Sequence, residues 1–359
     1  MKILQIMPEF GLAGAERMAE ALLLELKQRG HEVVAVSLFD YHSPITDNLE
    51  AHGIHIHYLG KKRGPDVSMF GKLYRVFLKE QPDIVHTHRY VCEYVIPAAV
   101  LAKVPGRVHT VHNVAEKERL PKKLQHMFYH FCHVTPVGLS PLVTESVQRF
   151  YKLPAHRVPT IYNGIQLAKT TQKTDYQARK PFRFLHVGRF AEQKNHVGLV
   201  KAFAEFHRSH PDSELTLVGT GELFEQVQQQ IRVLGLENVI HTPGLVNDII
   251  SQYSNFDAFL LPSIYEGMPI TLIEAMSSAM PIIASEVGGV PDMIRHDHSG
   301  LLCTSEPESI AAAMERIYTD AALRQRLGQQ AQVDCVKFSS QGMADAYLEV
   351  YRKALEQAK

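Results

Sequence analysis

The sequence predicts an α/β fold built from two Rossmann-like domains. Its 359 residues are too many for one ordinary domain and suit two. Short apolar runs of strand length alternate with helical patterns from residue 2 onward, and the alternation begins again at residue 183. Residues 166–181 lie between the two series and are mostly polar, which is typical of a linker. We therefore expect domains at 1–165 and 166–339 that face each other across a cleft, a common place for ligands.

The first half opens with a β-α-β unit. Residues 2–7 predict a buried strand, and apolar residues then recur with helical spacing over 15–26. The turn between them contains Gly11 and Gly14 but lacks the G-x-G-x-x-G spacing of dinucleotide-binding turns. Further strands are expected at 31–38, 54–59, 83–88, 107–111, 134–137 and 158–162, and further helices at 69–79 and 94–103.

The second half repeats the alternation after the linker. Apolar runs predict its strands, and amphipathic stretches of ten or more residues predict most of its helices. The strands are expected at 183–187, 215–218, 239–241, 258–261 and 282–284. The helices are expected at 197–207, 223–234, 248–253, from about 269 onward, and at 342–357.

Composition indicates a soluble globular enzyme, with 45% apolar and 21% charged residues. The four cysteines lie far apart and show neither metal spacing nor a disulfide framework, so a cytoplasmic protein is expected. The apolar run at the N-terminus is too short for a signal peptide, and no stretch has the length of a membrane span.

Charge is unevenly distributed although the formal net charge is zero. Residues 1–165 hold 20 Lys and Arg against 15 Asp and Glu, whereas the remainder holds 18 against 23. A basic first half favours an anionic partner. Residues 116–133 form a basic amphipathic stretch that suits peripheral contact with an anionic membrane, or else a solvated helix with its apolar stripe packed inward. Nucleic-acid binding is not expected, because no recognised motif is present.

The stretch from Pro262 to Met276 carries the clearest chemical signal. A buried strand precedes it, Gly267 and Pro269 break the chain, and a helix is expected to begin near that proline. The amides at a helix N-terminus favour a phosphate, and the ionised carboxylates of Glu266 and Glu274 accept hydrogen bonds from hydroxyl groups. A nucleotide sugar carries both kinds of group. The alternative is that the two acids are merely solvated.

Other candidate residues follow predicted strands directly. Arg189 and Lys194 lie on the loop after the strand 183–187, where a planar fork and a point charge could converge on a diphosphate. Two solvated cations are the alternative. His112 follows the strand 107–111 at its carboxyl end, where open α/β sheets bind ligands.

Metal binding is not expected. Three pairs of histidines have alternate spacing, but no third ligand accompanies any pair, and no Asp-x-Asp is present to hold a metal–diphosphate complex. The pairs are His55 with His57, His86 with His88, and His296 with His298.

These motifs together resemble those of retaining glycosyltransferases with the GT-B fold, in glycosyltransferase family 4. Glu266 and Glu274 match its Glu-x7-Glu signature, and Arg189 and Lys194 match its Gly-Arg-x4-Lys segment. His112 matches the histidine of its Thr-x-His-Asn segment. The chain departs from the family at Ala13, which replaces a glycine of the first turn, and at Gln166, which replaces an aspartate.

The resemblance implies a role for each matched residue. The expected catalytic residues are His112, Arg189, Lys194 and Glu266. The expected donor-binding residues are Gly14, Gly188, Gly219, Val246, Gly267, Met268, Ile270, Thr271 and Glu274. The final helix, within 340–359, is expected to cross back onto the first domain.

The resemblance also implies a reaction. A sugar would move from a UDP- or GDP-sugar, with retention, to a glycan or lipid-linked acceptor of bacterial envelope synthesis, without a cofactor or metal. Three alternatives stay open. The first is a nucleotide-sugar epimerase or a phosphorylase of the same architecture, and the second is a non-catalytic binding protein. The third is a glycoside hydrolase with two acid/base carboxylates, which Glu274 on a helix beside phosphate-binding amides disfavours.

Overall fold

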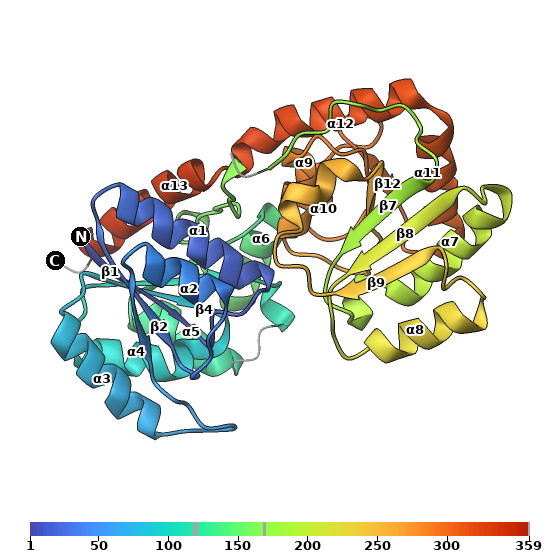
Figure 1. Cartoon of the computed structure of the whole chain (residues 1–359). Coiled ribbons are helices and arrows are strands. Elements are labelled where there is room, and N and C mark those ends of the chain that lie inside the picture. Colours follow the sequence, from blue (N-terminus) through green and yellow to red (C-terminus); the bar gives the residue numbers. More distant parts are fainter. Residues whose placement is uncertain (118–120, 168–169, 358–359) are drawn as a thin grey trace. The chain divides into compact units, whose positions relative to one another are not determined.

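The computed structural model describes residues 1–117, 121–167 and 170–357 (Figure 1). The chain forms two compact units. Unit 1 comprises Met1–Ile165 and Phe338–Lys359, and unit 2 comprises Gln166–Lys337.

Each unit contains a six-stranded parallel sheet, and the two sheets have the same strand order. Unit 1 runs β3-β2-β1-β4-β5-β6, and unit 2 runs β9-β8-β7-β10-β11-β12 when read in the same sense. In both sheets the first strand of the unit pairs with the second on one side and with the fourth on the other. The order reverses at that strand pair, and ligands in open α/β sheets bind beyond the carboxyl ends of such a pair. The predicted fold class is therefore confirmed.

The strands of unit 1 are almost entirely buried, as expected for parallel strands covered on both faces. They are β1 (Lys2–Met7), β2 (Glu32–Ser37), β3 (His55–Tyr58), β4 (Ile84–His88), β5 (Gly106–Val111) and β6 (Val134–Gly138). The helices are α1 (Gly14–Gln28), α2 (Pro44–Ala51), α3 (Ser68–Glu80), α4 (Cys92–Leu101), α5 (Lys122–Phe131), α6 (Pro141–Tyr151) and α13 (Ser340–Glu356).

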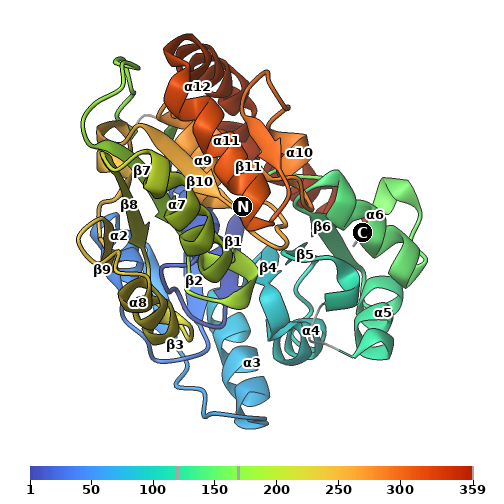
Figure 2. The ribbon, with the colours of Figure 1, turned by 90° about the vertical axis from the view of Figure 1, so that its right-hand side faces the viewer.

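The strands of unit 2 are β7 (Phe182–Val187), β8 (Ser213–Val218), β9 (Ile240–Gly244), β10 (Ala258–Leu261), β11 (Ile282–Ser285) and β12 (Leu301–Cys303). Its helices are α7 (His196–Ser209), α8 (Phe224–Val233), α9 (Ile270–Ser277), α10 (Val290–Met293), α11 (Pro307–Thr319) and α12 (Ala321–Cys335). Helix α7 packs beside α11 over one face of the sheet (Figure 2).

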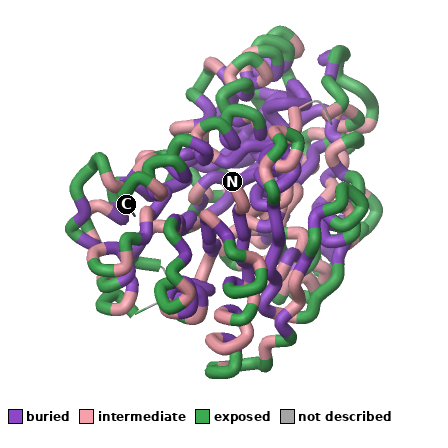
Figure 3. The backbone as a smooth tube through the Cα atoms, turned by 90° about the vertical axis from the view of Figure 1, so that its left-hand side faces the viewer, coloured by how far each residue is buried: buried purple, intermediate pink, exposed green. Residues whose placement is uncertain are grey.

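The described residues also form short 3₁₀ helices. They are η1 (Arg89–Val91), η2 (Ala115–Lys117), η3 (Ala155–Arg157), η5 (Glu192–Lys194), η6 (Ile250–Asn255) and η7 (Val336–Phe338). Figure 3 shows the buried strands in purple and the outer faces of the helices in green.

The C-terminal helix α13 packs on α1 and on the sheet of unit 1. Two of its tyrosines reach buried polar groups there. Tyr351 OH lies 2.7 Å from His86 Nδ1, and Tyr347 OH lies 2.7 Å from Thr110 Oγ1. Thr110 Oγ1 lies 2.7 Å from His86 Nε2, so the four groups form one buried network. Because the tyrosines of α13 and the polar groups of the sheet satisfy one another, this network ties the C-terminal helix to the rest of unit 1.

Several element predictions were wrong. Residues 158–162 form no strand; they make only a single bridge, between Thr160 and Gly138. Pro159 has no N–H to donate to a ladder, which disfavours a strand there. The expected helix 248–253 is the 3₁₀ helix η6. By contrast, the helix expected to begin near Pro269 is confirmed, because α9 begins at Ile270 with Pro269 as its N-cap. Helices α2, α6, α10, α11 and α12 and strand β12 were not predicted.

Candidate active site

In unit 2, the loops that follow β7 and β10 meet at the point where the strand order reverses. The backbone N–H of Ile264 donates to Gln193 O over 2.8 Å, and Gln193 Nε2 donates to Tyr265 O over 3.0 Å. Each loop therefore holds the other in place. These are the loops that carry Lys194 and Glu266.

Lys194 and Glu266 form a largely buried ion pair. Lys194 Nζ donates to Glu266 Oε1 over 2.6 Å, and the two side chains are 16% and 5% exposed. Ser263 Oγ donates to the same carboxylate oxygen over 2.6 Å. A charge-assisted contact between buried groups is strong and directional, so the ammonium and the carboxylate are held at one point.

The backbone on either side of this pair is held by specific contacts. Asn195 has φ +55° and begins α7 as its N-cap, with Oδ1 accepting from Gly198 N–H. Its Nδ2 donates to Pro262 O on the loop that carries Glu266. Gly288 has φ +54°, and a Cβ there would lie only 1.8 Å from Glu266 O. Only glycine tolerates both a positive φ and so close a backbone contact. Gly288 therefore lets the loop after β11 approach the backbone of Glu266 on the loop after β10.

Glycines also bring together the loops that follow β7 and β8. Gly219 has φ +135°, and a Cβ there would lie 2.0 Å from Gly188 O. The backbone continues the strand pairing across these loops, with Gly188 N–H donating to Val218 O and Phe190 N–H donating to Thr220 O, both over 3.0 Å. A ligand at this edge could approach the backbone of these glycines closely because glycine has no side chain.

Arg189 lies on the same loop but is held less firmly than Lys194. Its Nη2 donates to Glu222 Oε2 over 2.9 Å, and the two side chains are 72% and 54% exposed. An exposed pair of this kind contributes little to stability, so the guanidinium can turn to another anion at small cost.

Helix α9 presents its N-terminus at the same edge of the sheet. Its N-cap, Pro269, makes no side-chain cap, and the hydroxyl of Thr271 has no hydrogen-bond partner among the described residues. The first amides of a helix without a cap are available to an anion. Met268 and Ile270 are buried, which holds this turn in place.

Glu274 lies one turn further into α9 and is only 1% exposed. Tyr253, a fully buried residue of η6, donates its hydroxyl to Glu274 Oε2 over 2.9 Å. The tyrosine therefore orients the carboxylate. Val246 lies on the segment between β9 and η6, beside the exposed Leu245.

The corresponding edge of unit 1 carries His112 and Gly14. Gly14 is the first residue of α1, and His112 directly follows β5. His112 Nε2 lies 3.2 Å from His88 Nδ1, and His88 Nε2 lies 3.0 Å from Gln5 Oε1. Burial, with a further contribution from Arg89, lowers the pKa of His112 to about 3, so its imidazole is neutral at pH 7.

The structure thus brings the charged residues Arg189, Lys194, Glu266 and Glu274 to one sheet edge of unit 2. The same edge carries Gly188, Gly219, Val246, Gly267, Met268, Ile270 and Thr271. His112 and Gly14 belong to the matching edge of unit 1.

Sequence reasoning missed the residues that orient these groups. Ser263 stands within the stretch that was singled out, three residues before Glu266. Gly288 belongs to a Gly-Gly pair that follows β11, and such a pair is a signal for a close backbone approach. Tyr253 and Gln5 carried no local signal, because both are ordinary side chains within regular elements.

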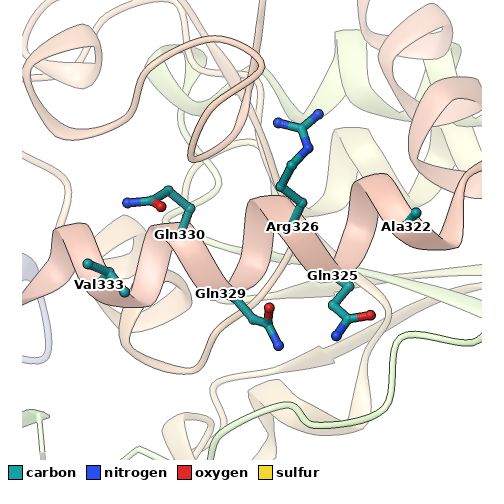
Figure 4. A pocket seen from close by; sticks show the side chains of 6 residues that line it. All are labelled: Ala322, Gln325, Arg326, Gln329, Gln330 and Val333. Carbon is teal, nitrogen blue, oxygen red and sulfur yellow. The ribbon is translucent and has the colours of Figure 1, made fainter.

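Neither metal chemistry nor a surface hollow points to a different site. No group of three or more His, Cys, Asp or Glu residues that could hold a metal ion is found in the described part of the chain. A hollow of about 360 Å³ lies along α12, which carries none of the predicted site residues (Figure 4). It is lined by Ala322, Gln325, Arg326, Gln329, Gln330 and Val333.

The models of two protein families together match nearly the whole chain. The family described as "Glycosyltransferase Family 4" matches residues 12–169, and that described as "Glycosyl transferases group 1" matches residues 169–334. The chain is 30% identical over 278 residues to the UDP-Gal:alpha-D-GlcNAc-diphosphoundecaprenol alpha-1,3-galactosyltransferase of Escherichia coli. The aligned residues cover 72% of this chain and 72% of that protein. This chain belongs to the group 1 glycosyltransferases of the GT-B fold. It is therefore a transferase that uses a nucleotide sugar.

Other relatives of this glycosyltransferase match over most of its length. The N-acetyl-alpha-D-glucosaminyl L-malate synthase of Bacillus anthracis is 23% identical, with 93% of this chain and 92% of that protein covered. Among solved structures, HepE of Anabaena in complex with UDP and glucose has a TM-score of 0.84 at 19% identity, covering 98% and 99% of the two chains. A glycosyltransferase of Rickettsia africae has a TM-score of 0.83 at 20% identity, covering 99% and 98%.

Proposed function

We propose that this glycosyltransferase transfers a hexose from a nucleoside diphosphate donor, with retention of the anomeric configuration. Unit 2 binds the donor. The observation that carries this proposal is the Lys194–Glu266 pair, which lies between the loops that follow β7 and β10, where the strand order reverses.

The pair supplies two complementary contacts for such a donor. When the diphosphate enters, Lys194 Nζ turns to its oxygens, and Glu266 accepts hydrogen bonds from the hydroxyl groups of the sugar. The exposed Arg189 turns from Glu222 to the same diphosphate. The amides at the start of α9 and the hydroxyl of Thr271 add donors without a net charge. Glu274, oriented by Tyr253, holds the ribose hydroxyls.

These contacts favour departure of the nucleoside diphosphate. Negative charge grows on the leaving phosphate oxygens in the transition state, and Arg189 and Lys194 are placed to stabilise it. In our proposal, the acceptor oxygen bonds to the anomeric carbon on the face that the phosphate leaves. The leaving phosphate oxygen takes the proton of the acceptor hydroxyl. The two cations perform the charge stabilisation that a metal performs in other transferases, so we expect activity to persist in EDTA.

The acceptor is proposed to be a glycan or lipid-linked intermediate of envelope or polysaccharide synthesis. The name of the Escherichia coli relative gives its acceptor as a sugar on diphosphoundecaprenol, and that of the Bacillus anthracis relative gives L-malate. Both acceptors are anionic, and the basic balance of residues 1–165 is compatible with either.

A thermal-shift screen with UDP-glucose, UDP-galactose, UDP-GlcNAc, GDP-mannose and ADP-glucose tests donor binding. A donor that binds the folded state raises the melting temperature, and at one hundred times its Kd it stabilises by about 2.7 kcal/mol. Product analysis with the stabilising donor then separates the alternatives. Release of nucleoside diphosphate with a free or transferred sugar supports transfer. An epimerised sugar or a sugar phosphate would instead identify an epimerase or a phosphorylase, and binding without turnover would identify a binding protein.

We also propose that residues 116–133 contact an anionic membrane surface. Helix α5 begins with the exposed Lys122 and Lys123, exposes Met127 and, at its last residue, Phe131 (75%), and buries Phe128 in the core. Residues 118–120 of this stretch lie outside the described residues. Exposed apolar side chains among lysines are typical of interfacial helices. No described helix is long and apolar enough to cross a bilayer.

Co-sedimentation with vesicles of phosphatidylglycerol and phosphatidylcholine tests this contact. The wild type should bind at low salt, and Phe131→Glu should bind several-fold less. Val233→Glu is the matched control, because Val233 is equally exposed on α8 of unit 2. Equal binding by both variants, or none by the wild type, would show that the stretch is only structural.

A further inference from the structure

Three polar side chains form a chain of hydrogen bonds that ends at His112. Gln5 lies on β1, His88 on β4, and His112 directly after β5. These strands are neighbours in the sheet of unit 1. Gln5 and His88 have no exposed surface at all. The contacts are 3.0 Å from Gln5 Oε1 to His88 Nε2 and 3.2 Å from His88 Nδ1 to His112 Nε2.

This series of hydrogen bonds determines which ring nitrogen of each histidine carries the proton. An amide oxygen only accepts hydrogen bonds, so His88 Nε2 carries the proton that it donates to Gln5. A neutral imidazole has one N–H, so His88 Nδ1 is an acceptor. His112 Nε2 must then carry the proton of the second contact. Its other nitrogen, Nδ1, is left unprotonated with an available lone pair.

The environment keeps both rings neutral. Burial, followed by the neighbouring rings of His86, His112 and His109, holds the pKa of His88 well below its usual range. The pKa of His112 is likewise lowered, to about 3. Each of the two rings therefore carries one proton at pH 7.

Gln5 lowers the stability of the fold at this position relative to an apolar residue. It is fully buried in a central strand, and its Nε2 has no hydrogen-bond partner among the described residues. An unsatisfied buried polar group costs about 1–3 kcal/mol. An apolar side chain would remove that cost, so the contact with His88 is what the glutamine contributes here.

We propose that Gln5 and His88 are positioning residues that hold His112 as its Nε2–H tautomer, so that Nδ1 accepts a hydrogen bond from a hydroxyl group of the sugar substrate. The sugar contact rests on the proposed function, whereas the tautomer does not. In this arrangement His112 is a neutral acceptor toward the sugar. A Gln5 amide turned by 180° would reverse both histidines and make Nδ1 a donor.

Nitrogen NMR of the ligand-free protein tests the tautomer directly. With ¹⁵N-labelled histidine, long-range proton–nitrogen spectra distinguish a protonated ring nitrogen from a bare one, and His112→Gln identifies the His112 signals by their loss. We expect Nε2 protonated and Nδ1 bare in the wild type. A protonated Nδ1 would overturn the proposal. Failure of sugar transfer would not affect this result, so the two proposals fail separately.

Two variants then test the positioning role. Gln5→Met removes the amide with little change of volume, and we expect the single His112 tautomer to become a mixture of two. Tyr351→Phe is the control, because it removes a hydrogen bond from His86, whose ring centroid lies 4.3 Å from that of His88, without touching the chain. It should leave the His112 signals unchanged. Unchanged His112 signals in Gln5→Met would contradict the role of Gln5, and the wild-type spectrum tests the tautomer even if that variant does not fold.

Discussion

The two units have one strand order but place different chemistry where that order reverses. In unit 2, an ammonium and a carboxylate meet there, Lys194 with Glu266, and glycines pack the loops backbone to backbone. In unit 1, the predicted site residue His112 ends an uncharged contact, His88 with Gln5, although Arg89, next to His88 in the sequence, pairs with Glu16 of α1; Gly11 of the loop after β1 has open space around its Cβ position. The same scaffold therefore holds an ion pair between predicted site residues in unit 2 and an uncharged hydrogen-bonded series ending at His112 in unit 1.

The physical reason lies in burial. A charge that is taken from water needs a partner of opposite sign, as Lys194 has in Glu266. The buried histidines of unit 1 lack such a partner. Burial lowers the pKa of His109 to about 4 and that of His112 to about 3, so both rings are neutral at pH 7. Four predictions test this contrast, beginning with the largest expected effect.

Replacing Lys194 by alanine should lower the rate of nucleoside diphosphate release about 100- to 1000-fold, because one preorganised charge is removed from the leaving group. The rate is measured with the donor that the thermal-shift screen selects. Lys201→Ala, an exposed change on α7, is the control and should keep the wild-type rate. A normal rate in a folded Lys194→Ala protein would refute the catalytic role of this lysine.

Replacing Gly288 by alanine should destabilise unit 2 by about 2–4 kcal/mol, because the new Cβ would overlap Glu266 O at a positive φ. Gly11→Ala is the matched change in unit 1 and should be close to neutral, since nothing lies within 4 Å of its Cβ position. Denaturant unfolding of both variants measures the difference. Equal losses would mean that the loops of the two units are packed alike.

Acid should destabilise unit 1 more than unit 2. Within the described residues, unit 1 has four fully or largely buried histidines with lowered pKa values, and unit 2 has two; they are His86, His88, His109 and His112, and His186 and His196. Their folded pKa values lie below 6.5, so the unfolded chain binds more protons in acid. Stability is therefore complete near pH 7 and falls as the pH drops below 6.5.

Each such histidine should cost about 2 kcal/mol between pH 7 and pH 5. Hydrogen exchange of peptides from each unit, corrected for the intrinsic rate at each pH, gives the opening free energies. The loss should be larger in unit 1. A larger loss in unit 2 would show that burial does not keep the histidines of unit 1 neutral.

The smallest effect is expected from Tyr253→Phe, which removes the hydroxyl that orients Glu274. Loss of one such hydrogen bond costs about 1 kcal/mol, or roughly a fivefold rise in the Kd for UDP by calorimetry. Tyr318→Phe is the control, because its hydroxyl bonds to Asp212, a residue that none of the proposed ligand contacts involves. An unchanged Kd in Tyr253→Phe would mean either that Glu274 does not bind the ribose or that Tyr253 is not needed to orient it.

Some of the elements that were not predicted carry a recognisable sequence signal, and others do not. Helices α2 and α6 both begin with Ser-Pro, at Ser43 and Ser140, and each serine accepts a capping hydrogen bond, which is a recognisable start signal. Strand β12 has only three residues, too few for a periodic pattern. Residues 158–162 had the apolar character of a strand, but their bridge to β6 is a single pair.

The sequence by itself determined the two α/β domains and the stretch from Pro262 to Met276, because periodicity, turn residues and motif spacing are local properties of a chain. Only the tertiary structure decided that Lys194 pairs with Glu266, that Tyr253 orients Glu274, and that Gln5 and His88 hold His112. These partners come from different strands, helices and loops, tens of residues apart. Which of them meet depends on strand order and on burial, and neither can be read from one segment alone.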